Sequence, residues 1–483
     1  MIHFAVIARI LGILLMLFSL AMLPPIVVSY VYADGAAQAF ITAMVMIFSM
    51  GFTLWLPVRL EREELRTRDG FIIAALFWIT LGLAGTLPFM LAEQPSLSFA
   101  DAFFESFSGW TTTGATVMTG LEYLPKSILW YRQQLQWLGG MGIIVLAVAI
   151  LPMLGVGGMQ LYRTEMPGPM KDAKLTPRIA ETAKALWYVY AFLTLSCAGA
   201  YWLAGMSAFD AIVHSFSTVG IGGFSTYDAS IAHFNSPAIE LICTFFMLVA
   251  AINYSLHFYA WRNKSVASYR SNSELRFFLQ ILGVSALIVI AVLWLTQTYS
   301  LPDAIRFGVF ELVTIATTTG FSSANFTAWP VFLPVMLFLL AFIGGCTGST
   351  AGGMKVLRVL LIYKQGIHEI RRLIHPSAVM QVKLGKQVIS DRVLNAVWGF
   401  FAVYILTFVV MMLALMGTGL DHVTAFSAVG ACLNNLGPGM GAVAENYSSI
   451  SDTAKWLLAL TMLLGRLEIF TLLVLITPSF WRA

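Results

Sequence analysis

Charged residues are scarce in this 483-residue chain. Asp, Glu, Lys and Arg make up 11% of the residues, whereas hydrophobic residues make up 59%. Soluble domains carry about 25% charged residues, and no polar stretch here is long enough to fold as a separate soluble domain. The composition therefore excludes a soluble globular protein and indicates an integral membrane protein.

Cysteine is also rare. The four cysteines, Cys197, Cys243, Cys346 and Cys432, lie far apart and mostly in apolar surroundings. Their spacing indicates neither a metal site nor a disulfide framework.

The first apolar stretch, 11–28, lacks a small-residue cleavage site, so we interpret it as a retained helix rather than a signal peptide.

Motifs for catalysis are missing as well. The sequence contains no His-Glu-x-x-His pattern, no nucleophile elbow and no phosphate-binding loop. It therefore does not predict a membrane-embedded enzyme, and any nucleotide dependence would have to come from a partner. No apolar stretch carries regularly spaced arginines, so a voltage sensor is not predicted either.

Positive charge is present, but it is unevenly placed. Lysine and arginine gather around 59–68, 163–184, 262–276 and 355–392, and the segments between contain almost none. The positive-inside rule places these four clusters in the cytoplasm.

A membrane-spanning helix needs about 20 apolar residues. The candidate spans are roughly 5–30, 36–57, 71–92, 131–156, 186–205, 237–260, 277–298, 330–354, 393–417 and 455–477. Ten spans put both termini in the cytoplasm.

Four short glycine-bearing segments recur at intervals of roughly a hundred residues, which indicates a repeat. We call them glycine loops 1 to 4: Thr111–Ala115, Gly220–Phe224, Thr317–Phe321 and Asn434–Pro438. Each follows an apolar stretch of about a dozen residues, too short to cross a membrane. These stretches are 101–112, 208–219, 305–317 and 422–434. The charge pattern puts all four loops on the outer face, although glycines that merely pack helices are the alternative.

The sequence thus predicts an all-α integral membrane protein with ten transmembrane helices and four re-entrant pore half-helices. They form a pseudo-fourfold repeat of helix–pore loop–helix units around one pore. An N-terminal two-helix extension, 1–69, precedes four repeats, and the third repeat contains an intramembrane glycine-rich loop. The repeats are 70–183, 184–276, 277–390 and 391–483.

Together with the glycine loops, four segments carry a resemblance to a known family. They are Gln136–Ile143, Asn253–His257, Gly344–Lys355 and Arg371–Pro376. Over essentially its whole length the chain resembles the Trk/Ktr/HKT superfamily of potassium transporters, specifically the bacterial TrkH/TrkG type. The resemblance implies a potassium-translocating subunit of the bacterial inner membrane. It also implies a homodimer that contacts membrane lipids, works with a cytosolic, nucleotide-binding regulator of the TrkA type, and binds no nucleic acid and no organic cofactor.

The glycine loops are the candidate selectivity filter. Backbone carbonyls can replace the water shell of potassium without a fixed charge that would trap the ion, and glycine permits the conformations that align them. Each half-helix also points its partly negative C-terminal end into the membrane. Glycine at Gly114, Gly223, Gly320 and Gly437 is what the family associates with potassium over sodium. The residues assigned to ion contact are Thr112, Thr113, Gly114, Ala115, Gly220, Ile221, Gly222, Gly223, Phe224, Thr318, Thr319, Gly320, Phe321, Asn435, Leu436, Gly437 and Pro438.

A glycine-rich stretch interrupts the eighth candidate span. Glycine costs a helix about 1 kcal/mol per residue relative to alanine, and the stretch begins too early for the span to have crossed the membrane. It is therefore predicted to be a movable loop below the filter rather than a cytoplasmic linker, and it resembles the family's intramembrane gating loop. Its residues are Gly344, Gly345, Cys346, Thr347, Gly348, Ser349, Thr350, Ala351, Gly352 and Gly353.

Arg466 lies near the middle of the last candidate span. A charged residue there costs about 2.5–3.5 kcal/mol on insertion scales and marks a functional site by default. We predict that Arg466 faces the pore near the filter and acts as part of the gate; a snorkelling arginine or a structural pair is the alternative. Glu468 is two positions away and faces elsewhere on a helix.

Two mechanisms remain open at this point. The first is a gated, channel-like potassium pore, and the second is a proton- or sodium-coupled symporter on the same scaffold. Coupling would need titratable groups on the path, for which Glu105, Glu311 and Glu468 are the candidates. Glu105 and Glu311 could instead brace the half-helices.

Overall fold

The structure, a computed structural model, describes residues 3–61, 67–145, 175–330, 332–377, 380–385 and 387–481. Within these ranges it consists of α-helices, short 3-10 turns and one antiparallel hairpin of strands β1 (Lys383–Leu384) and β2 (Gln387–Val388). The end of the candidate span 131–156 and much of the basic cluster 163–184 lie outside the described residues.

The helices follow one another in a simple order along the chain. They are α1 (Phe4–Ser19), α2 (Leu23–Tyr32), α3 (Ala37–Trp55), α4 (Thr67–Ala84), α5 (Thr86–Leu91), α6 (Phe99–Trp110), α7 (Lys126–Val145), α10 (Leu175–Leu203), α11 (Ala208–Gly220), α12 (Pro237–Ala250), α13 (Tyr254–Arg262), α14 (Ala267–Ser271), α15 (Ser273–Leu295), α16 (Leu301–Ala316), α17 (Leu333–Ile343), α18 (Val356–Ile374), α19 (Asp391–Met416), α20 (His422–Asn434), α21 (Asp452–Arg466), α22 (Phe470–Ile476) and α23 (Pro478–Trp481).

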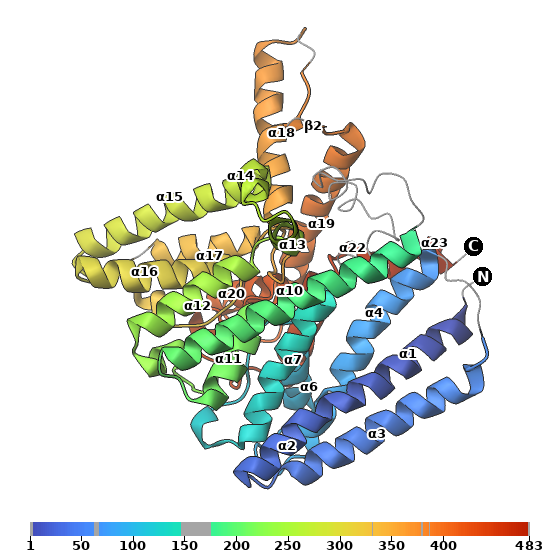
Figure 1. Cartoon of the computed structure of the whole chain (residues 1–483). Coiled ribbons are helices and arrows are strands. Elements are labelled where there is room, and N and C mark those ends of the chain that lie inside the picture. The colour runs from blue at the N-terminus through green and yellow to red at the C-terminus, as the bar shows by residue number, and fades with distance from the viewer. Residues whose placement is uncertain are drawn as a thin grey trace.

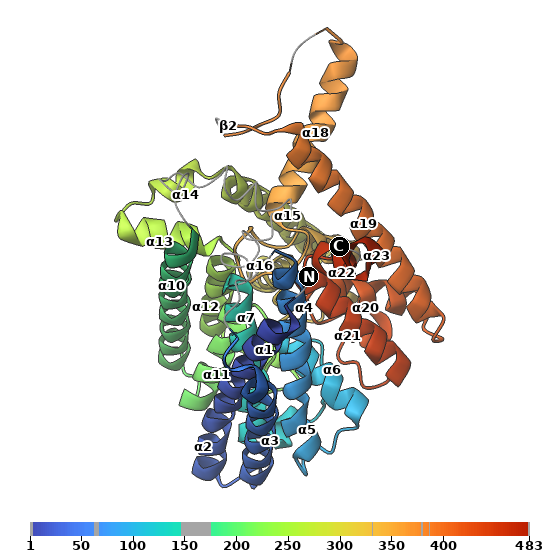
Figure 2. The same ribbon diagram turned by 90° about the vertical axis from the view of Figure 1, so that its right-hand side faces the viewer.

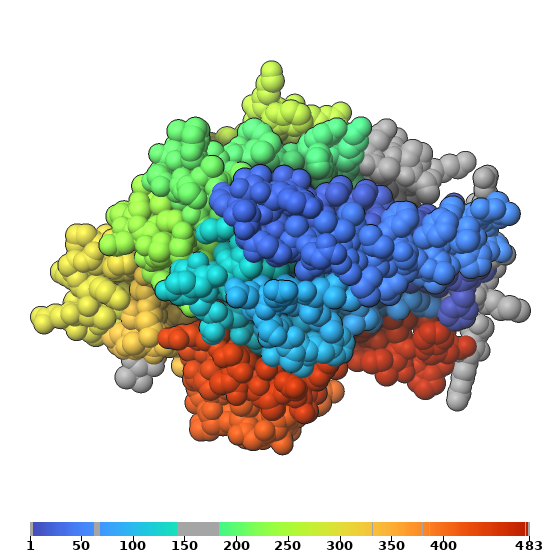
Figure 3. Space-filling view, turned by 90° about the horizontal axis from the view of Figure 1, so that it is seen from below, coloured from blue at the N-terminus to red at the C-terminus, as the bar shows by residue number. Residues whose placement is uncertain are grey.

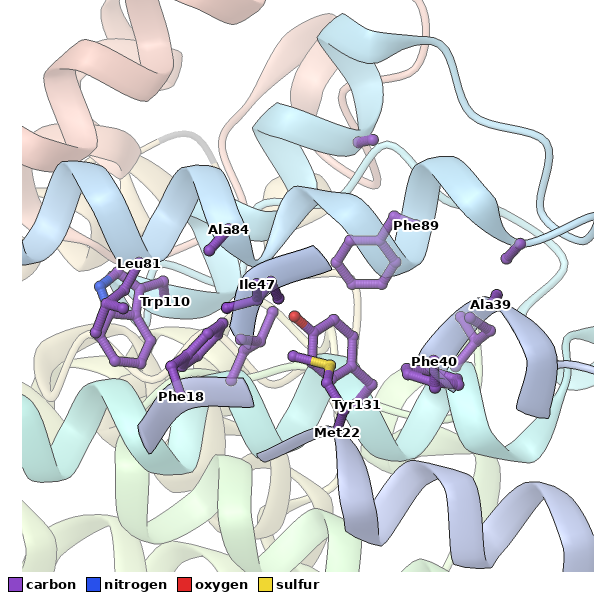
Figure 4. Packing of buried hydrophobic residues seen from close by; sticks show 14 of the residues in the cluster. Phe18, Met22, Ala39, Phe40, Ile47, Leu81, Ala84, Phe89, Trp110 and Tyr131 are labelled. Atoms are coloured by element: carbon purple, nitrogen blue, oxygen red, sulfur yellow. The ribbon is translucent and has the colours of Figure 1, made fainter. Parts of the chain in front are cut away.

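The N-terminal helices α1 to α3 pack against α4 and α7 on one side of the molecule (Figure 1). Phe18 of α1 and Met22 of the 3-10 turn before α2 meet Trp110 and Tyr131 in a buried cluster (Figure 4). Seen from below, the segments coloured green, yellow and then orange to red follow one another around the molecule (Figure 3). In this view they lie around the blue and cyan segments of the chain (Figure 3).

The four short helices α6, α11, α16 and α20 match the four apolar stretches that precede the glycine loops. Three of them begin with Ser-x-x-Asp, in which the N-cap serine (Ser98, Ser207 or Ser300) accepts a hydrogen bond from the backbone N–H of the aspartate three residues on. This is a local capping arrangement. In α20 the cap is Asp421 itself, and hydrogen bonds from the side chain and backbone of Thr424 lower the pKa of its carboxyl.

The long spans differ from the prediction in three places. Six described helices are long and apolar enough to cross a membrane, or up to eight spans if each bent pair counts as one. The candidate span 237–260 is α12 and α13, bent by 91°, and 455–477 is α21 and α22, bent by 111°. The third, 330–354, is helical only over α17, because the chain turns at Gly344 with a φ of 70°.

Helix α18 projects from the body of the molecule together with the hairpin β1–β2 (Figures 1 and 2). Its first residues are buried, whereas Arg371 and Arg372 in its last turn are exposed. The sequence marked this region as a basic cluster that ends in the family-like segment Arg371–Pro376, and it did not predict a projecting helix. The structure shows that the glycine-rich stretch leads directly into this projecting helix.

Candidate ion pathway

The four short helices α6, α11, α16 and α20 end in the same backbone geometry although their loop sequences differ. The residue after each helix, or after its last turn, has a left-handed φ between 51° and 63°: Thr112, Ile221, Thr318 and Asn435. The next N–H bonds back at 2.8 Å to the carbonyl five residues earlier in all four loops, which is a Schellman motif. Three of these left-handed residues are β-branched and rarely adopt that conformation, so the surrounding structure must hold them there.

The glycine of each loop follows two positions later, again with a positive φ. The values are 83° at Gly114, 76° at Gly223, 87° at Gly320 and 94° at Gly437. A Cβ atom added at Gly114 would fall on the carbonyl oxygen of Gly222, one at Gly223 on that of Thr319, and one at Gly320 on that of Leu436. A Cβ at Gly437 would lie 2.8 Å from the carbonyl oxygen of Thr113. Each loop thus abuts the next, and loop 4 returns to loop 1, so the four loops close into a ring.

Buried side chains hold the ring from outside. Gln136 on α7 donates to the carbonyl of Gly222 at 2.7 Å and accepts from the N–H of Phe224 at 3.1 Å. The hydroxyl of Tyr447 donates to the carbonyl of Gly437 at 2.8 Å, and the Asn435 amide donates to the Thr113 hydroxyl at 2.9 Å. The carbonyls of Gly222 and Gly437 therefore already have protein donors, which fixes the loops against one another.

Glu105 braces glycine loop 1 through a buried ion pair. Arg132 donates to its carboxylate at 2.8 Å, to Thr116 at 3.0 Å and to the carbonyl of Ser225 at 3.2 Å. The guanidinium also lies 4.3 Å from the ring centroid of Phe224. The sequence predicted that Glu105 could brace the half-helix, but it did not identify Arg132 as the partner of Glu105. The available signal was that Arg132 stands in a segment that contains almost no other lysine or arginine.

One side of the ring opens into a cavity of about 510 Å³. All four loop glycines line it, together with residues that follow them in the chain. Charged residues at its wall include Arg132, Asp228, Glu311 and Glu445. The structure therefore brings the four predicted glycines together at the floor of one hollow.

The glycine-rich stretch contacts the opposite side of the ring, because it touches residues that precede the loop glycines. The N–H of Gly352 donates to the Thr318 hydroxyl at 2.7 Å, and that of Gly353 to the carbonyl of Asn434 at 3.2 Å. The Thr350 hydroxyl donates to the carbonyl of Val219 at 3.1 Å. The stretch thus lies against the C-terminal ends of α11 and α20 and against glycine loop 3.

Arg466 joins the glycine-rich stretch to glycine loop 1. Its side chain is 6% exposed. The guanidinium donates to the carbonyl of Thr111 and to the hydroxyl of Thr112 in loop 1. It also donates to the carbonyl of Thr350 at 3.3 Å. Among the described residues it has no carboxylate partner. Glu468 instead pairs with Arg358 at 2.5 Å.

Another carboxylate, missed by the sequence analysis, anchors the ends of the glycine-rich stretch. Glu274 at the start of α15 accepts from the N–H of Thr347 at 2.6 Å and from that of Leu357 at 3.1 Å. It therefore links the stretch to the first turn of α18. These contacts join residues more than seventy positions apart, for which the sequence carries no local signal.

Six described helices are long and apolar enough to cross a membrane, and the four glycine loops close into a ring of backbone carbonyls. Together these two features are typical of multi-pass membrane transport proteins. A family model described as "TrkH: Cation transport protein" matches residues 36–482. The chain therefore belongs to the TrkH family, which confirms the resemblance. The family consists of transport proteins and not enzymes.

Relatives of this chain cover its whole length. The Trk system potassium uptake protein TrkH of Halomonas elongata is 60% identical over 476 residues, 99% of each chain. The TrkG protein of Escherichia coli K12, also called a Trk system potassium uptake protein, is 43% identical over 100% of this chain and 99% of its own. The crystal structure of the potassium transporter TrkH from Vibrio parahaemolyticus superposes with a TM-score of 0.93 at 53% identity, covering both chains fully.

Proposed function

We propose that this chain takes up potassium across the bacterial inner membrane through a selective, gated, channel-like pore. The observation that carries the proposal is the closed ring in which each loop glycine abuts a carbonyl of the next loop. Such a ring offers backbone oxygens at a site where no larger side chain fits, which is how potassium filters are built. Relatives named as potassium uptake proteins support potassium as the transported ion.

The proposal includes the finer architecture. The half-helices α6, α11, α16 and α20 are re-entrant, each bent pair or interrupted helix completes one of ten spans, and the repeats divide as 70–183, 184–276, 277–390 and 391–483. Both termini lie in the cytoplasm. The chain is the translocating subunit of a Trk-type system, works as a homodimer, and responds to a TrkA-type, nucleotide-binding partner.

The pairing of the candidate acids favours a pore over a coupled symporter. Glu105 is neutralised by Arg132 and Glu468 by Arg358. The charge of each carboxylate is thus balanced by an arginine of the same chain, so neither is an unpaired charge offered to a coupling ion. Of the three candidates, Glu311 alone has no cationic partner among the described residues.

Flux through purified protein in proteoliposomes separates the two mechanisms. With potassium and proton gradients imposed independently, a pore passes potassium only down its own electrochemical gradient, and we expect this result. Uphill potassium accumulation driven by a proton or sodium gradient alone would contradict the pore and establish the symporter.

Removing most of the stretch Gly345–Gly353 is expected to raise basal potassium flux severalfold, because the deletion removes the chain that covers the inner side of the ring. A milder test is Gly352→Ala, whose Cβ would fall on the carbonyl oxygen of Asn434 and push the loop away. Gly366→Ala is the matched control, since nothing lies within 4 Å of a Cβ there. Rubidium efflux measures the effect, and flux at or below wild type in a well-folded deletion would identify a structural linker instead.

A further inference from the structure

One position in each half-helix lies nine residues before the loop glycine, and it differs among the four. The residues there are Glu105, His214, Glu311 and Ala428. All four are buried, at 0–1% exposed for the three polar ones. Two are chemically identical glutamates, so a comparison of their surroundings shows what each carboxylate still lacks.

Two of these side chains are fully engaged. Glu105 pairs with Arg132 and accepts from the N–H of Val117 at 2.9 Å. His214 uses both ring nitrogens, one against the carbonyl of Asp210 at 2.8 Å and one against the Ser225 hydroxyl at 2.9 Å. Neither group has free bonding capacity directed at an ion.

Glu311 is engaged on one oxygen only. Its Oε1 accepts from the N–H of Ser323 at 2.7 Å, from the Ser323 hydroxyl at 3.3 Å and from the N–H of Ala324 at 3.0 Å. Its Oε2 makes no hydrogen bond, and no lysine or arginine pairs with it, within the part of the chain that the structure describes. The nearby Arg306 is taken by Glu240 at 2.7 Å.

This half-satisfied carboxylate lines the 510 Å³ cavity outside the ring. The same wall also carries the carboxylates of Asp228 and Glu445. Among the described lining residues, Arg132 alone is cationic, and its guanidinium is already paired with Glu105. Asp228 is bound by the N–H groups of Gly120 and Leu121. A buried carboxylate without a cation is unfavourable, and a mobile cation in the cavity would supply the missing charge.

We infer that Glu311 forms an outer binding site for a monovalent cation, at which potassium is held beside the ring before it enters. The inference rests on the proposed conduction path and adds to it a residue that sets the apparent affinity for potassium. Because Ala428 and the neutralised Glu105 offer no equivalent, the site lies off the pore axis, toward glycine loop 3. Glu311 also positions that loop through Ser323 and Ala324.

The test is Glu311→Gln in the full-length protein, reconstituted in proteoliposomes. Glutamine keeps an oxygen for the Ser323 and Ala324 N–H groups but removes the charge. We expect the potassium concentration for half-maximal rubidium uptake to rise about tenfold, which is about 1.4 kcal/mol, while the potassium-to-sodium selectivity stays near wild type. Potassium-dependent thermal stabilisation of the purified protein, with choline as the comparison salt, should weaken in parallel.

Glu445→Gln is the matched control. It removes another carboxylate of the same cavity, but an exposed one that salt screens, so we expect a change of less than about twofold. Glu311→Asp keeps the charge but shortens the side chain by one methylene, which moves the carboxylate away from the cavity. We expect the half-maximal potassium concentration to rise by roughly threefold, less than in Glu311→Gln. An unchanged value in folded Glu311→Gln, or in Glu311→Asp if the glutamine variant does not fold, overturns the outer site. A wild-type protein that fails to pass potassium would instead overturn the proposed function.

Discussion

Replacing Gly223 by serine is expected to lower the potassium-to-sodium selectivity of uptake by at least about tenfold, or about 1.4 kcal/mol. The residue has a φ of 76°, and its Cβ would fall on the carbonyl oxygen of Thr319 and lie 2.9 Å from the carbonyl carbon of Gly320. Something in loop 3 must then move, and the carbonyls that replace the ion's water shell lose their spacing. Gly114→Ser meets the carbonyl of Gly222 in the same way.

The measurement is the ratio of rubidium to sodium uptake, with folded yield determined in parallel. Gly35→Ser is the matched control, because Gly35 has a similar φ of 82° but nothing lies within 4 Å of an added Cβ. The control therefore carries the backbone strain without the clash. Unchanged selectivity in both Gly114→Ser and Gly223→Ser would show that these loops are not the filter.

Arg466→Ala is expected to raise basal potassium flux severalfold and to weaken dependence on a cytosolic regulator. If potassium passes about 4 Å from Arg466, as we propose, the unit charge would contribute about 4 kcal/mol at an effective dielectric of about 20, so losing the guanidinium would lower the barrier to the ion. The side chain also ties Thr111 of loop 1 to Thr350 of the glycine-rich stretch. Its loss therefore both lowers the electrostatic barrier and frees the loop that covers the ring.

A companion variant, Arg466→Lys, decides between a barrier and a structural clamp. Arg466→Lys keeps the charge without the planar fork of donors, so a barrier role predicts near-normal flux and a clamp role predicts damage. Because Glu468 is already paired with Arg358, the alanine variant removes the ion-pair partner of no carboxylate among the described residues. Low folded yield by size-exclusion chromatography in both variants, with no gain of rubidium flux in alanine, would reject the barrier.

The four short helices α6, α11, α16 and α20 were predictable because their signals are local. A serine cap with an aspartate three residues on begins three of them, and a glycine that needs a positive φ follows each. The predicted stretches 208–219 and 422–434 agree with α11 and α20 to within a residue. Such signals act within one turn of chain, so a single sequence contains them.

The bent spans were not predictable, because the contacts that hold the bends join residues far apart in the sequence. The break between α21 and α22 falls at Glu468 and Ile469, both with positive φ and neither a residue type that signals a turn. Glu468 is held there by Arg358, 110 positions earlier. The ties of Gln136 and Arg466 to the ring likewise span 86 and 355 positions. Composition and periodicity carry no information about such long-range partners.

The closed ring is made by one chain rather than by four identical subunits, and this bears on how the protein can change over time. In a symmetric tetramer one substitution alters all four quadrants of a filter at once. Here a substitution at Gly437, whose Cβ would lie 2.8 Å from the carbonyl oxygen of Thr113, acts directly on glycine loop 4 and on its contact with loop 1, and not on all four loops at once. Of the four loop glycines, Gly437 has the longest distance between an added Cβ and the carbonyl oxygen of the neighbouring loop, so a change of ion preference by single substitutions is expected to begin at loop 4.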